Sequence, residues 1–432
     1  MSDETEKSVL IITYYWPPSG GSGVQRWLKF VKYLPTFGYT PYVFTPENPA
    51  FEIKDESLVK DVPPQAEVLH FPIWEPYHLF TKLAGKKPGD KNITVPKPDS
   101  LFKKVSIWIR GNIFIPDPRI FWVRPSVQFL QDFIREKKIR TIITTGPPHS
   151  VHLIGRSLKK RNPSLRWIAD FRDPWSEWFL LDTLQVGWLA RKIHKHLERT
   201  VLQSADRITT VTPFYVRHFQ RLGNRAVSLL TNGYDEEDFE DFTYMPTEKF
   251  IIRHVGKVVE ECDPLPFMEA VAALCKSNNA LQRAIRIDFV GQVNEPFKEY
   301  VRQHQVLQSV VTFTPMVSHK EVIGLYAQSN VLLLILSGYK DAEGYMPGKL
   351  FEYCATGLPI LGVGPEAGDA AQLINSLKCG IMVSEKESEK MEKAILQYFN
   401  TWASGVTELH THTEQYSRKA ITGQLTELLS YP

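Results

Sequence analysis

Residues 13–35 read TYYWPPSGGSGVQRWLKFVKYLP, and this stretch decides the fold class of the first half of the chain. The segment just before it, SVLIIT at residues 8–13, is a short apolar run of the kind that forms a buried parallel strand. Apolar residues then recur at helical spacing, namely Val24, Trp27, Leu28, Val31 and Leu34. The glycines between strand and helix, among them Gly21 and Gly23, let the backbone approach a bulky group, and the first helical amides favour an anion.

This loop resembles only part of a dinucleotide-binding fingerprint. Gly21 and Gly23 supply its first two glycines, but Arg26 stands where the third glycine belongs. The strand ending near Thr45 also lacks the acidic residue that would read a ribose. A dehydrogenase is therefore disfavoured. A plain tight turn is the alternative, although two prolines and several small residues make this loop longer than such a turn needs.

The alternation of short apolar strands with helical segments continues along the chain. In the first half, strands are expected at residues 42–45, 141–144, 166–169, 208–211 and 227–230. In the second half, they are expected at 250–255, 286–290, 331–335 and 359–363. This pattern predicts an α/β protein with parallel, doubly wound sheets in two Rossmann-like domains.

We expect these domains at roughly residues 1–235 and 240–405. Residues 406–432 contain a helical pattern, YSRKAITGQLTELL, that is expected to cross back onto the first domain. Two such domains facing each other would form a cleft at the C-terminal ends of their strands, where open α/β sheets bind ligands.

Composition narrows the class of protein. The chain has 432 residues, of which 43% are hydrophobic and 23% charged, with a formal net charge of +3. So small a charge disfavours a nucleic-acid partner. There is no apolar run long enough to cross a membrane, and residues 1–8, MSDETEKS, do not resemble a secretory signal. The four cysteines show no CxxC pairing, which favours a reducing cytoplasm as the location.

The acidic stretch between the two halves is TNGYDEEDFED, residues 231–241. Its Asn-Gly pair is a turn signal. We expect a solvated hinge here. A metal site built from these consecutive carboxylates is the less favoured alternative.

The second informative stretch is EGYMPGKLFEYCATGLPILGVG, residues 343–364. A polar loop runs into a short helix, so the amides of Gly348 and Lys349 would lie at a helix N-terminus and favour phosphate. Glu352 follows one helical turn later, and its carboxylate is an acceptor suited to the two hydroxyls of a ribose. Taken singly, a surface salt bridge for Glu352 and a solvated side chain for Lys349 would be the simpler interpretations.

Several of these stretches resemble the motifs of one known family. PGKLFEYCATGLPILGVG is similar to the donor motif of the GT-B glycosyltransferases of the large retaining family four, also called group 1. The loop at 13–35, LLTNGYDEEDF, SHKEVIGLYAQSNVLLL and YSRKAITGQL are similar to its other motifs, with Asn330 in place of the usual Asp. DFRDPW at 170–175 and IRGNIFIPDPRIFW at 109–122 resemble a subset that builds bacterial surface polysaccharides.

The resemblance implies a fold, a donor and a set of binding residues. The fold would be two facing Rossmann-like domains, with a nucleotide-sugar donor, a retaining transfer and no required metal or other cofactor. The donor-binding residues would be Gly21, Gly23, Gly256, Lys257, Glu343, Gly348, Lys349, Leu350 and Glu352. Glu343 is one residue out of register with the family's first glutamate. After Lys257, acidic residues stand where the family has a second cation.

Candidate catalytic residues come from two stretches of the first domain. His149 lies in TTGPPHS, and Arg172 and Asp173 lie in DFRDPW with Asp170. Both stretches follow strands and are expected to point into the cleft. Asp173 is similar in position to a residue that contacts the donor sugar in the family. An Arg172–Asp173 pair that only braces the loop is an equal alternative. Trp175 and Trp178 could form the floor of a sugar site or pack in the core.

Residues 100–115 carry a short apolar stripe, Leu101, Val105, Trp108 and Asn112, with Lys103, Ser106 and Arg110 on another face. With the basic GKKPGDK just upstream, this segment could lie on a membrane surface. We slightly favour an insertion packed on the first domain, because the stripe is short and ends at a polar residue.

Together these features predict a cytoplasmic glycosyltransferase that moves a sugar from a nucleotide-diphosphate sugar to a glycan or lipid-linked acceptor. Peripheral contact with the inner face of the membrane stays open. The glycine loop would lie beneath the diphosphate and the acceptor, and PGKL would supply the second wall. The alternatives are a GT-B epimerase or phosphorylase, and a nucleotide-sugar-binding scaffold without turnover.

Overall fold

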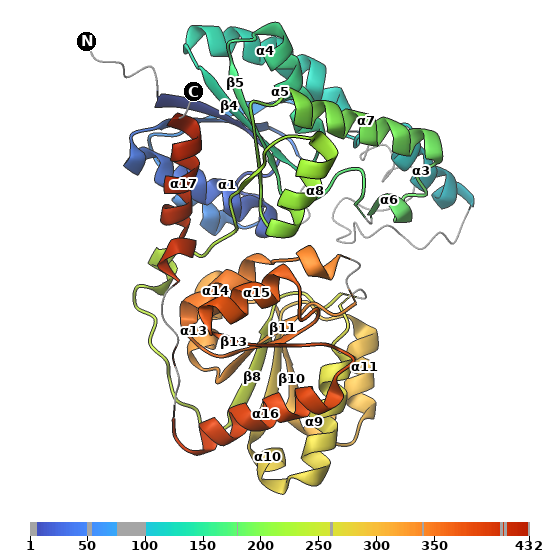
Figure 1. Ribbon diagram of the computed structural model, residues 1–432, viewed down its shortest axis with the longest axis vertical. Coiled ribbons are helices and arrows are strands. Elements are labelled where there is room, and N and C mark those ends of the chain that lie inside the picture. Colours follow the sequence, from blue (N-terminus) through green and yellow to red (C-terminus); the bar gives the residue numbers. More distant parts are fainter. Residues whose placement is uncertain are drawn as a thin grey trace. The chain divides into compact units, whose positions relative to one another are not determined.

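The computed structural model describes residues 7–49, 54–75, 101–178, 180–259, 262–338, 341–406, 409 and 413–430. The side chains of residues 22, 101–103 and 180 lie outside this description. The chain divides into two compact units (Figure 1). Unit 1 is Met1–Thr231 with Ile421–Pro432, and unit 2 is Asn232–Ala420.

Unit 1 is built on a seven-stranded parallel sheet with the order β3-β2-β1-β4-β5-β6-β7. The strands are β1 (Ser8–Ile12), β2 (Thr40–Pro46), β3 (Glu67–Phe71), β4 (Thr141–Gly146), β5 (Arg166–Phe171), β6 (Arg207–Thr210) and β7 (Ser228–Leu229). Val9 through Ile12 of the central strand are completely buried, because helices cover both faces of the sheet.

Helices form one layer on each face of this sheet (Figure 1). One face packs against α1 (Ser22–Tyr33) and α17 (Arg418–Ser430). The other packs against α4 (Ile120–Glu136), α5 (Ser150–Arg161), α7 (Trp188–Ser204) and α8 (Pro213–Gly223). A separate small core joins α3 (Leu101–Asn112) and α6 (Leu180–Thr183) to the start of α7. Two short 3-10 turns, Leu34–Phe37 and Glu56–Asp61, complete the described elements.

The expected return of the C-terminal helix to the first domain is confirmed. Ile421, Leu425 and Leu429 of α17 are buried in the same core as Val9 and Ile11 of β1. The Arg166 side chain also donates hydrogen bonds to the carbonyls of Leu428 and Leu429, at 2.6 and 3.0 Å. The chain therefore passes between the units twice, after Thr231 and after Ala420.

Unit 2 is built on a six-stranded parallel sheet with the order β10-β9-β8-β11-β12-β13. Its strands are β8 (Phe250–Val255), β9 (Ile285–Val290), β10 (Val311–Thr314), β11 (Val331–Ile335), β12 (Ile360–Val363) and β13 (Gly380–Val383). Central β8 reads FIIRHV and pairs with β9 in register from Phe250↔Ile285 to Val255↔Val290.

Helices again cover both faces of the sheet. One face carries α9 (Leu265–Ser277), α10 (Asn279–Ala284), α11 (Glu295–Gln303), α12 (Leu307–Val310) and α16 (Ser388–Ala403). The other carries α13 (His319–Ala327), α14 (Gly348–Thr356) and α15 (Asp369–Leu377). The 3-10 turns Glu236–Phe239, Ala342–Gly344 and Glu414–Tyr416 lie in the connections. Both units are Rossmann-like, as expected.

The acidic stretch at 231–241 lies at the boundary between the two units, but it is solvated only in part. Asp235 is only 4% exposed. Tyr234 pairs through its backbone with the segment that leads into α17, donating to the Tyr416 carbonyl at 3.2 Å and accepting from the Arg418 amide at 2.8 Å. Asp238 lies 3.7 Å from the His319 ring. The expected solvation thus holds for Glu237, Glu240 and Asp241, which are exposed, and not for Asp235, which is buried.

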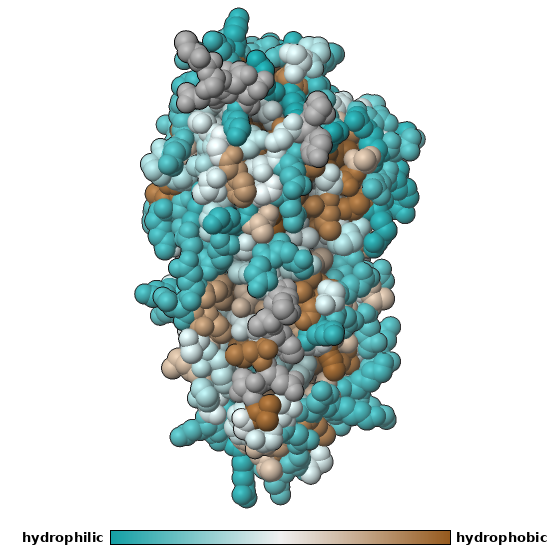
Figure 2. Space-filling view, turned by 60° about the vertical axis from the view of Figure 1, so that its left-hand side comes forward, coloured by the Kyte–Doolittle hydropathy of each residue, from teal (hydrophilic) through white to brown (hydrophobic). Residues whose placement is uncertain are grey.

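Hydrophilic residues cover most of the face shown in Figure 2. Among the described residues, no helix combines the length and the apolar character needed to cross a membrane.

Candidate functional site

The candidate site lies at the C-terminal edge of the unit 2 sheet, where open parallel sheets bind ligands. Strand β8 ends at Val255 and is followed by Gly256. The loop after β11 leads into α14, which begins at Gly348. Helix α14 has no side-chain cap and no acidic residue in its first turn. The amides of that turn are therefore suited to an anion.

Lys349 connects α14 to the end of β8. Its Nζ lies 3.2 Å from Nε2 of His254 and donates to the Val255 carbonyl, also at 3.2 Å. Gly256 has a φ of +127°, and a Cβ atom there would stand 3.1 Å from Nζ of Lys349. Glycine at 256 thus serves two purposes: it permits the turn and leaves space beside the amine.

His254 presents a lone pair to Lys349. Its Nδ1 lies 3.0 Å from the Leu333 carbonyl, which can only accept a hydrogen bond, so Nδ1 carries the proton. Burial, and then the charge of Lys349, hold the pKa of His254 well below its ordinary value. The ring is therefore neutral, and its Nε2 accepts from Lys349.

Burial makes the charged form of Lys349 less favourable than it would be in water. Burial lowers the pKa of Lys349 from its ordinary 10.5 to about 8. Its direct partners are a neutral ring and a carbonyl, and within the described parts of the chain no carboxylate forms an ion pair with it. A poorly compensated ammonium beside free helix amides would gain from an anion, since a buried charge is costly without a partner.

Glu352 lies one turn further along α14 and is 26% exposed. The Tyr326 hydroxyl donates to its Oε2 at 2.9 Å, and Nε2 of His319 lies 3.4 Å from its Oε1. Burial alone would raise the pKa of Glu352, but the His319 and Tyr326 contacts outweigh it and lower the pKa below its ordinary value. The result is an ionised, partly exposed carboxylate in a fixed orientation, close to Lys349.

The other predicted donor residues occupy varied positions around this edge. Lys257 and Glu343 are exposed, one after β8 and the other in the loop before α14. A Cβ atom on Gly348 would meet nothing within 4 Å, so the start of α14 is open. Leu350 is completely buried in the core, so its side chain is unavailable to a ligand and only its backbone lies near the site.

Of the acidic residues that follow Lys257, the structure describes Asp263. Glu260 and Glu261 lie outside the described residues. The Asp263 carboxylate accepts the Leu265 amide at 3.0 Å, at the start of α9.

At the corresponding edge of unit 1, Arg172 ties three loops together. Its guanidinium donates to the carbonyls of Gly23, Gly146 and Pro147, at 2.7, 3.2 and 2.7 Å. Gly21 precedes α1 with a φ of +90°, and α1, like α14, lacks a side-chain cap and an acidic residue in its first turn. The loops after β1, β4 and β5 are thereby fixed against one another.

Asp170 and Arg26 are also fully engaged within unit 1. They form a buried ion pair at 2.9 Å, and their side chains are 0% and 1% exposed. The same carboxylate accepts hydrogen bonds from Trp27, Thr145 and Thr209. Since both charges are compensated, this pair serves structure and is not available to a phosphate.

The remaining predicted catalytic residues, His149 and Asp173, differ in their surroundings. His149 is buried and stacks on Trp175 with ring centroids 5.1 Å apart, and neither ring nitrogen makes a hydrogen bond of normal geometry. Burial first, and then neighbouring His152, hold the pKa of His149 well below its ordinary value, which makes it a weak base. Burial raises the pKa of Asp173, and Arg172 opposes this shift. The Arg172 guanidinium donates to carbonyls, so the alternative of an Arg172–Asp173 brace is not formed as a direct hydrogen bond among the described residues.

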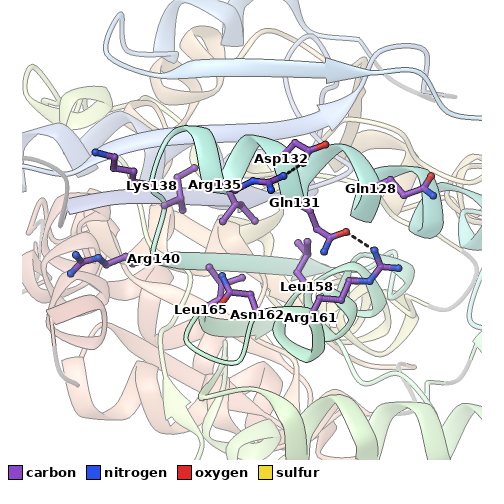
Figure 3. A pocket seen from close by; sticks show the side chains of 12 residues that line it. Gln128, Gln131, Asp132, Arg135, Lys138, Arg140, Leu158, Arg161, Asn162 and Leu165 are labelled. Carbon is purple, nitrogen blue, oxygen red and sulfur yellow. Dashed lines mark hydrogen bonds and ion pairs between the residues drawn. The ribbon is translucent and has the colours of Figure 1, made fainter.

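A hollow of about 860 Å³ lies elsewhere on unit 1 (Figure 3). Arg140 and Leu165, which directly precede β4 and β5, help to line it, as do Arg135 and Arg161. In Figure 3 Arg161 donates to Gln131, and Arg135 pairs with Asp132. This hollow is at the amino ends of the strands, the opposite edge from the one at which such sheets bind ligands.

Residues 249–401 match the family model of the glycosyl transferases group 1. The matched region contains β8, α13 and α14, and therefore Lys349, Glu352 and their partners. No curated protein sequence matches the chain.

Solved structures of low sequence identity share the whole fold. A glycosyltransferase from Rickettsia africae is 13% identical with a TM-score of 0.62, and the alignment covers 98% of each chain. A sucrose-phosphate synthase from Thermosynechococcus elongatus is 14% identical with a TM-score of 0.61 and the same coverage. WaaG, a glycosyltransferase involved in lipopolysaccharide biosynthesis, is 14% identical with a TM-score of 0.57, over 98% of this chain and 100% of WaaG. The expected GT-B architecture of two Rossmann-like domains is confirmed.

Sequence reasoning found Lys349 and Glu352 but not the residues that orient them. His254 was assigned only to a strand, FIIRHV, although a histidine beside the strand-ending glycine was a usable signal. His319 and Tyr326 stand in SHKEVIGLYAQSN, where they were recognised only as part of a motif.

Proposed function

We propose that the protein is a glycosyltransferase that uses a nucleotide-diphosphate sugar as donor. The observation that carries the proposal is the arrangement on α14: an ammonium and an ionised carboxylate, one helical turn apart, at an uncapped helix N-terminus within the region that matches group 1. A diphosphate and a ribose are the two adjacent parts of such a donor that need a cation and an acceptor pair.

Each residue has a distinct role in this proposal. Lys349 and the first amides of α14 bind the diphosphate, while His254 and Gly256 hold the amine in place. Glu352 accepts hydrogen bonds from the ribose hydroxyls, oriented by Tyr326 and His319. Lys257 adds a second, more exposed cation. Glu343 is left for contact with the sugar.

Unit 1 is proposed to bind the acceptor, a glycan or a lipid-linked saccharide. The loop with Gly21 and Gly23, held by Arg172, supplies backbone amides, and Asp173 acts near the transferred sugar. We further propose that transfer retains the anomeric configuration, needs no metal and serves cell-surface polysaccharide synthesis. The resemblance of DFRDPW and the structural likeness to WaaG support the last point.

Nucleoside diphosphate titration of the wild type and Lys349→Ala tests the donor site. Calorimetry should show binding to the wild type and a loss of at least about tenfold in the variant, since a charge-assisted hydrogen bond contributes roughly 1.5–3 kcal/mol. Equal affinity in the two proteins would refute this assignment.

Turnover of a radiolabelled nucleotide sugar, with and without a lipid-linked acceptor, tests the reaction. Transfer only when the acceptor is present supports a glycosyltransferase. Rearrangement or release of the sugar without it would indicate an epimerase or phosphorylase. Binding with no turnover of any kind would indicate a scaffold.

A further inference from the structure

Helix α7 carries large apolar side chains on its exposed face. Trp188, Leu189 and Ile193 are 71%, 57% and 40% exposed. The opposite stripe of the helix is buried, and it includes Ala190 and His194. The exposed apolar residues are therefore surplus to the packing of α7 on unit 1.

Helix α3 adds to this apolar surface. Val105, Trp108 and the following Ile113 are 48%, 48% and 59% exposed, whereas Ile107 faces the small core. The apolar stripe that we expected to pack on the domain thus points outward in its described part.

The ends of the two helices are joined directly. The backbone amide of Gly187 donates to Oδ1 of Asn112 at 2.7 Å, and the side-chain amide of Asn112 donates to the Gln185 carbonyl at 3.2 Å. Figure 1 draws α3 and α6 next to the start of α7. We call this region the α3–α7 surface and define it by six residues: Val105, Trp108, Ile113, Trp188, Leu189 and Ile193.

The exposed charges within helix α7 itself are all positive, although Asp182 of α6 pairs with Arg191 at 2.6 Å. Helix α7 exposes Lys192, Lys195 and Arg199, while Glu198, the single acidic residue within its bounds, is completely buried. Nζ of Lys192 lies 5.0 Å from the centre of the Trp188 ring, so cation and apolar anchor are adjacent. A cationic face with tryptophan and leucine beside it is typical of helices that lie in a membrane interface.

A basic hollow of about 570 Å³ adjoins the same helix. Glu177 is the carboxylate in its lining, which otherwise includes four lysines and arginines and two histidines: Lys192, Lys195, Arg199, Arg221, His196 and His218. Glu177 is 4.0 Å from Lys195 and 3.6 Å from the His218 ring, so it compensates only part of this charge. Such a hollow suits the phosphate of a lipid headgroup.

We propose that the α3–α7 surface binds the surface of an anionic lipid bilayer. The apolar side chains enter the interface, and the cations of α7 contact phosphate headgroups. Attraction to an anionic surface amounts to about 1 kcal/mol for each nearby Lys or Arg. The inference rests on the proposed function for its purpose, which is to bring unit 1 to a lipid-linked acceptor, but its test does not depend on sugar transfer.

Vesicle sedimentation tests the proposal on the full chain. The wild type should sediment with vesicles of phosphatidylcholine and phosphatidylglycerol, more weakly with phosphatidylcholine alone, and less at high salt. Lys192→Glu with Lys195→Glu should reduce binding about tenfold or more. Trp188→Ser with Leu189→Ser should also reduce it, because anchoring area is lost.

Matched controls separate this surface from general effects. Lys160→Glu with Arg161→Glu makes the same charge change on exposed positions of α5, and Met316→Ser removes a 69% exposed apolar side chain from unit 2. Both controls should bind vesicles like the wild type. All variants should keep the circular dichroism spectrum and the denaturation midpoint of the wild type, which shows that unit 1 is folded, and its nucleoside diphosphate affinity, which shows that unit 2 is folded.

Three outcomes would overturn the proposal. The first is that the wild type does not sediment with vesicles although it binds nucleoside diphosphate. This result would refute membrane binding without contradicting the proposed donor site. The second is equal sedimentation of the α7 variants and the wild type. The third is that the wild type is a dimer in sedimentation velocity, and that Trp188→Ser with Leu189→Ser dissociates this dimer but leaves vesicle binding unchanged. A second copy of the chain, and not a bilayer, would then be the partner of this surface.

Discussion

Lys349 has the environment that leads to the most specific prediction about ligand binding. With a pKa lowered to about 8, its amine is charged at neutral pH and becomes neutral as the pH rises above 8. A bound diphosphate would stabilise the charged form and raise this pKa. Between about pH 7, above which the terminal phosphate is ionised, and pH 8 the affinity should be level, and above pH 8 it should fall by up to about tenfold per pH unit.

Substitutions distinguish Lys349 from other cations. Lys349→Ala should cost more nucleoside diphosphate affinity than Lys257→Ala, because Lys257 is exposed and screened. Lys349→Arg should restore binding in part, since the planar head needs more room, and its affinity should no longer fall above pH 8. Calorimetry across this pH range is the measurement. A large loss in Arg172→Ala, with none in Lys349→Ala, would move the role to unit 1.

Glu352 can be tested against the part of the ligand that it is proposed to contact. Glu352→Ala should weaken nucleoside diphosphate binding at least about tenfold, since two charge-assisted hydrogen bonds are lost. A 2′,3′-dideoxy analogue has no ribose hydroxyls to offer, so wild type and variant should bind it alike. If the variant loses affinity for both ligands equally, Glu352 acts on the phosphates or on the fold.

Asp173 should matter to turnover more than to nucleotide binding. Asp173→Asn keeps the shape and removes the charge, so a strong loss of kcat with an unchanged nucleoside diphosphate Kd is expected if it lies near the reacting sugar. Full turnover in the variant would reduce Asp173 to a structural residue of the loop.

The limits of sequence reasoning are visible at this scale. Lys349 and Glu352 could be found because they share one short helix, where spacing alone sets their separation. His254 lies 95 residues from Lys349, so only the fold reveals their contact. Arg172 was predicted to be catalytic because it follows a strand, but a guanidinium has several donors, and here the structure directs them to carbonyls.

At the scale of elements, the Arg26–Asp170 pair joins α1 to the central strands. Asp170→Asn should destabilise unit 1 by about 3–5 kcal/mol, because it leaves a buried guanidinium without its counterion. Chemical denaturation followed by tryptophan fluorescence gives this number. Exposed Asp182→Asn, which removes a surface partner of Arg191, is the matched control and should change stability by less than about 1 kcal/mol. Similar losses in both variants would contradict the structural role of the buried pair.

With the exception of β7, the strands that the sequence predicted are largely buried. β1, β4, β8 and β11 are short apolar runs, and the structure confirms each of them. β3, β10 and β13 were missed. All three lie at sheet edges. The residues of β3 and β10 are largely half-buried, so their sequences EVLHF and VTFT carry weaker hydrophobic signals. β13, GIMV, is brief and begins with glycine, which favours turns.

For the whole molecule, two units with separate cores predict two separable responses to a ligand. If unit 2 binds the nucleoside diphosphate as proposed, the ligand at about 100 times its Kd stabilises this unit by about 2.7 kcal/mol. The ligand should therefore raise the unfolding temperature of unit 2. Hydrogen exchange should show added protection at β8 and α14, and little added protection at β1 and β4. Equal protection of both units would show that the ligand binds both or couples them.

The return of α17 to unit 1 also bears on how the protein is made. A ribosome releases the strands of unit 1 first, but their core lacks Ile421, Leu425 and Leu429 until all of unit 2 has been translated. Unit 2, whose strands are contiguous from β8 to β13, has everything it needs earlier. The usual order of co-translational folding, with the N-terminal domain first, is thus reversed for its final step. In the nascent chain, α1 covers only part of this face of the unit 1 sheet, so the part that awaits α17 stays uncovered longest and is the surface that a chaperone would meet.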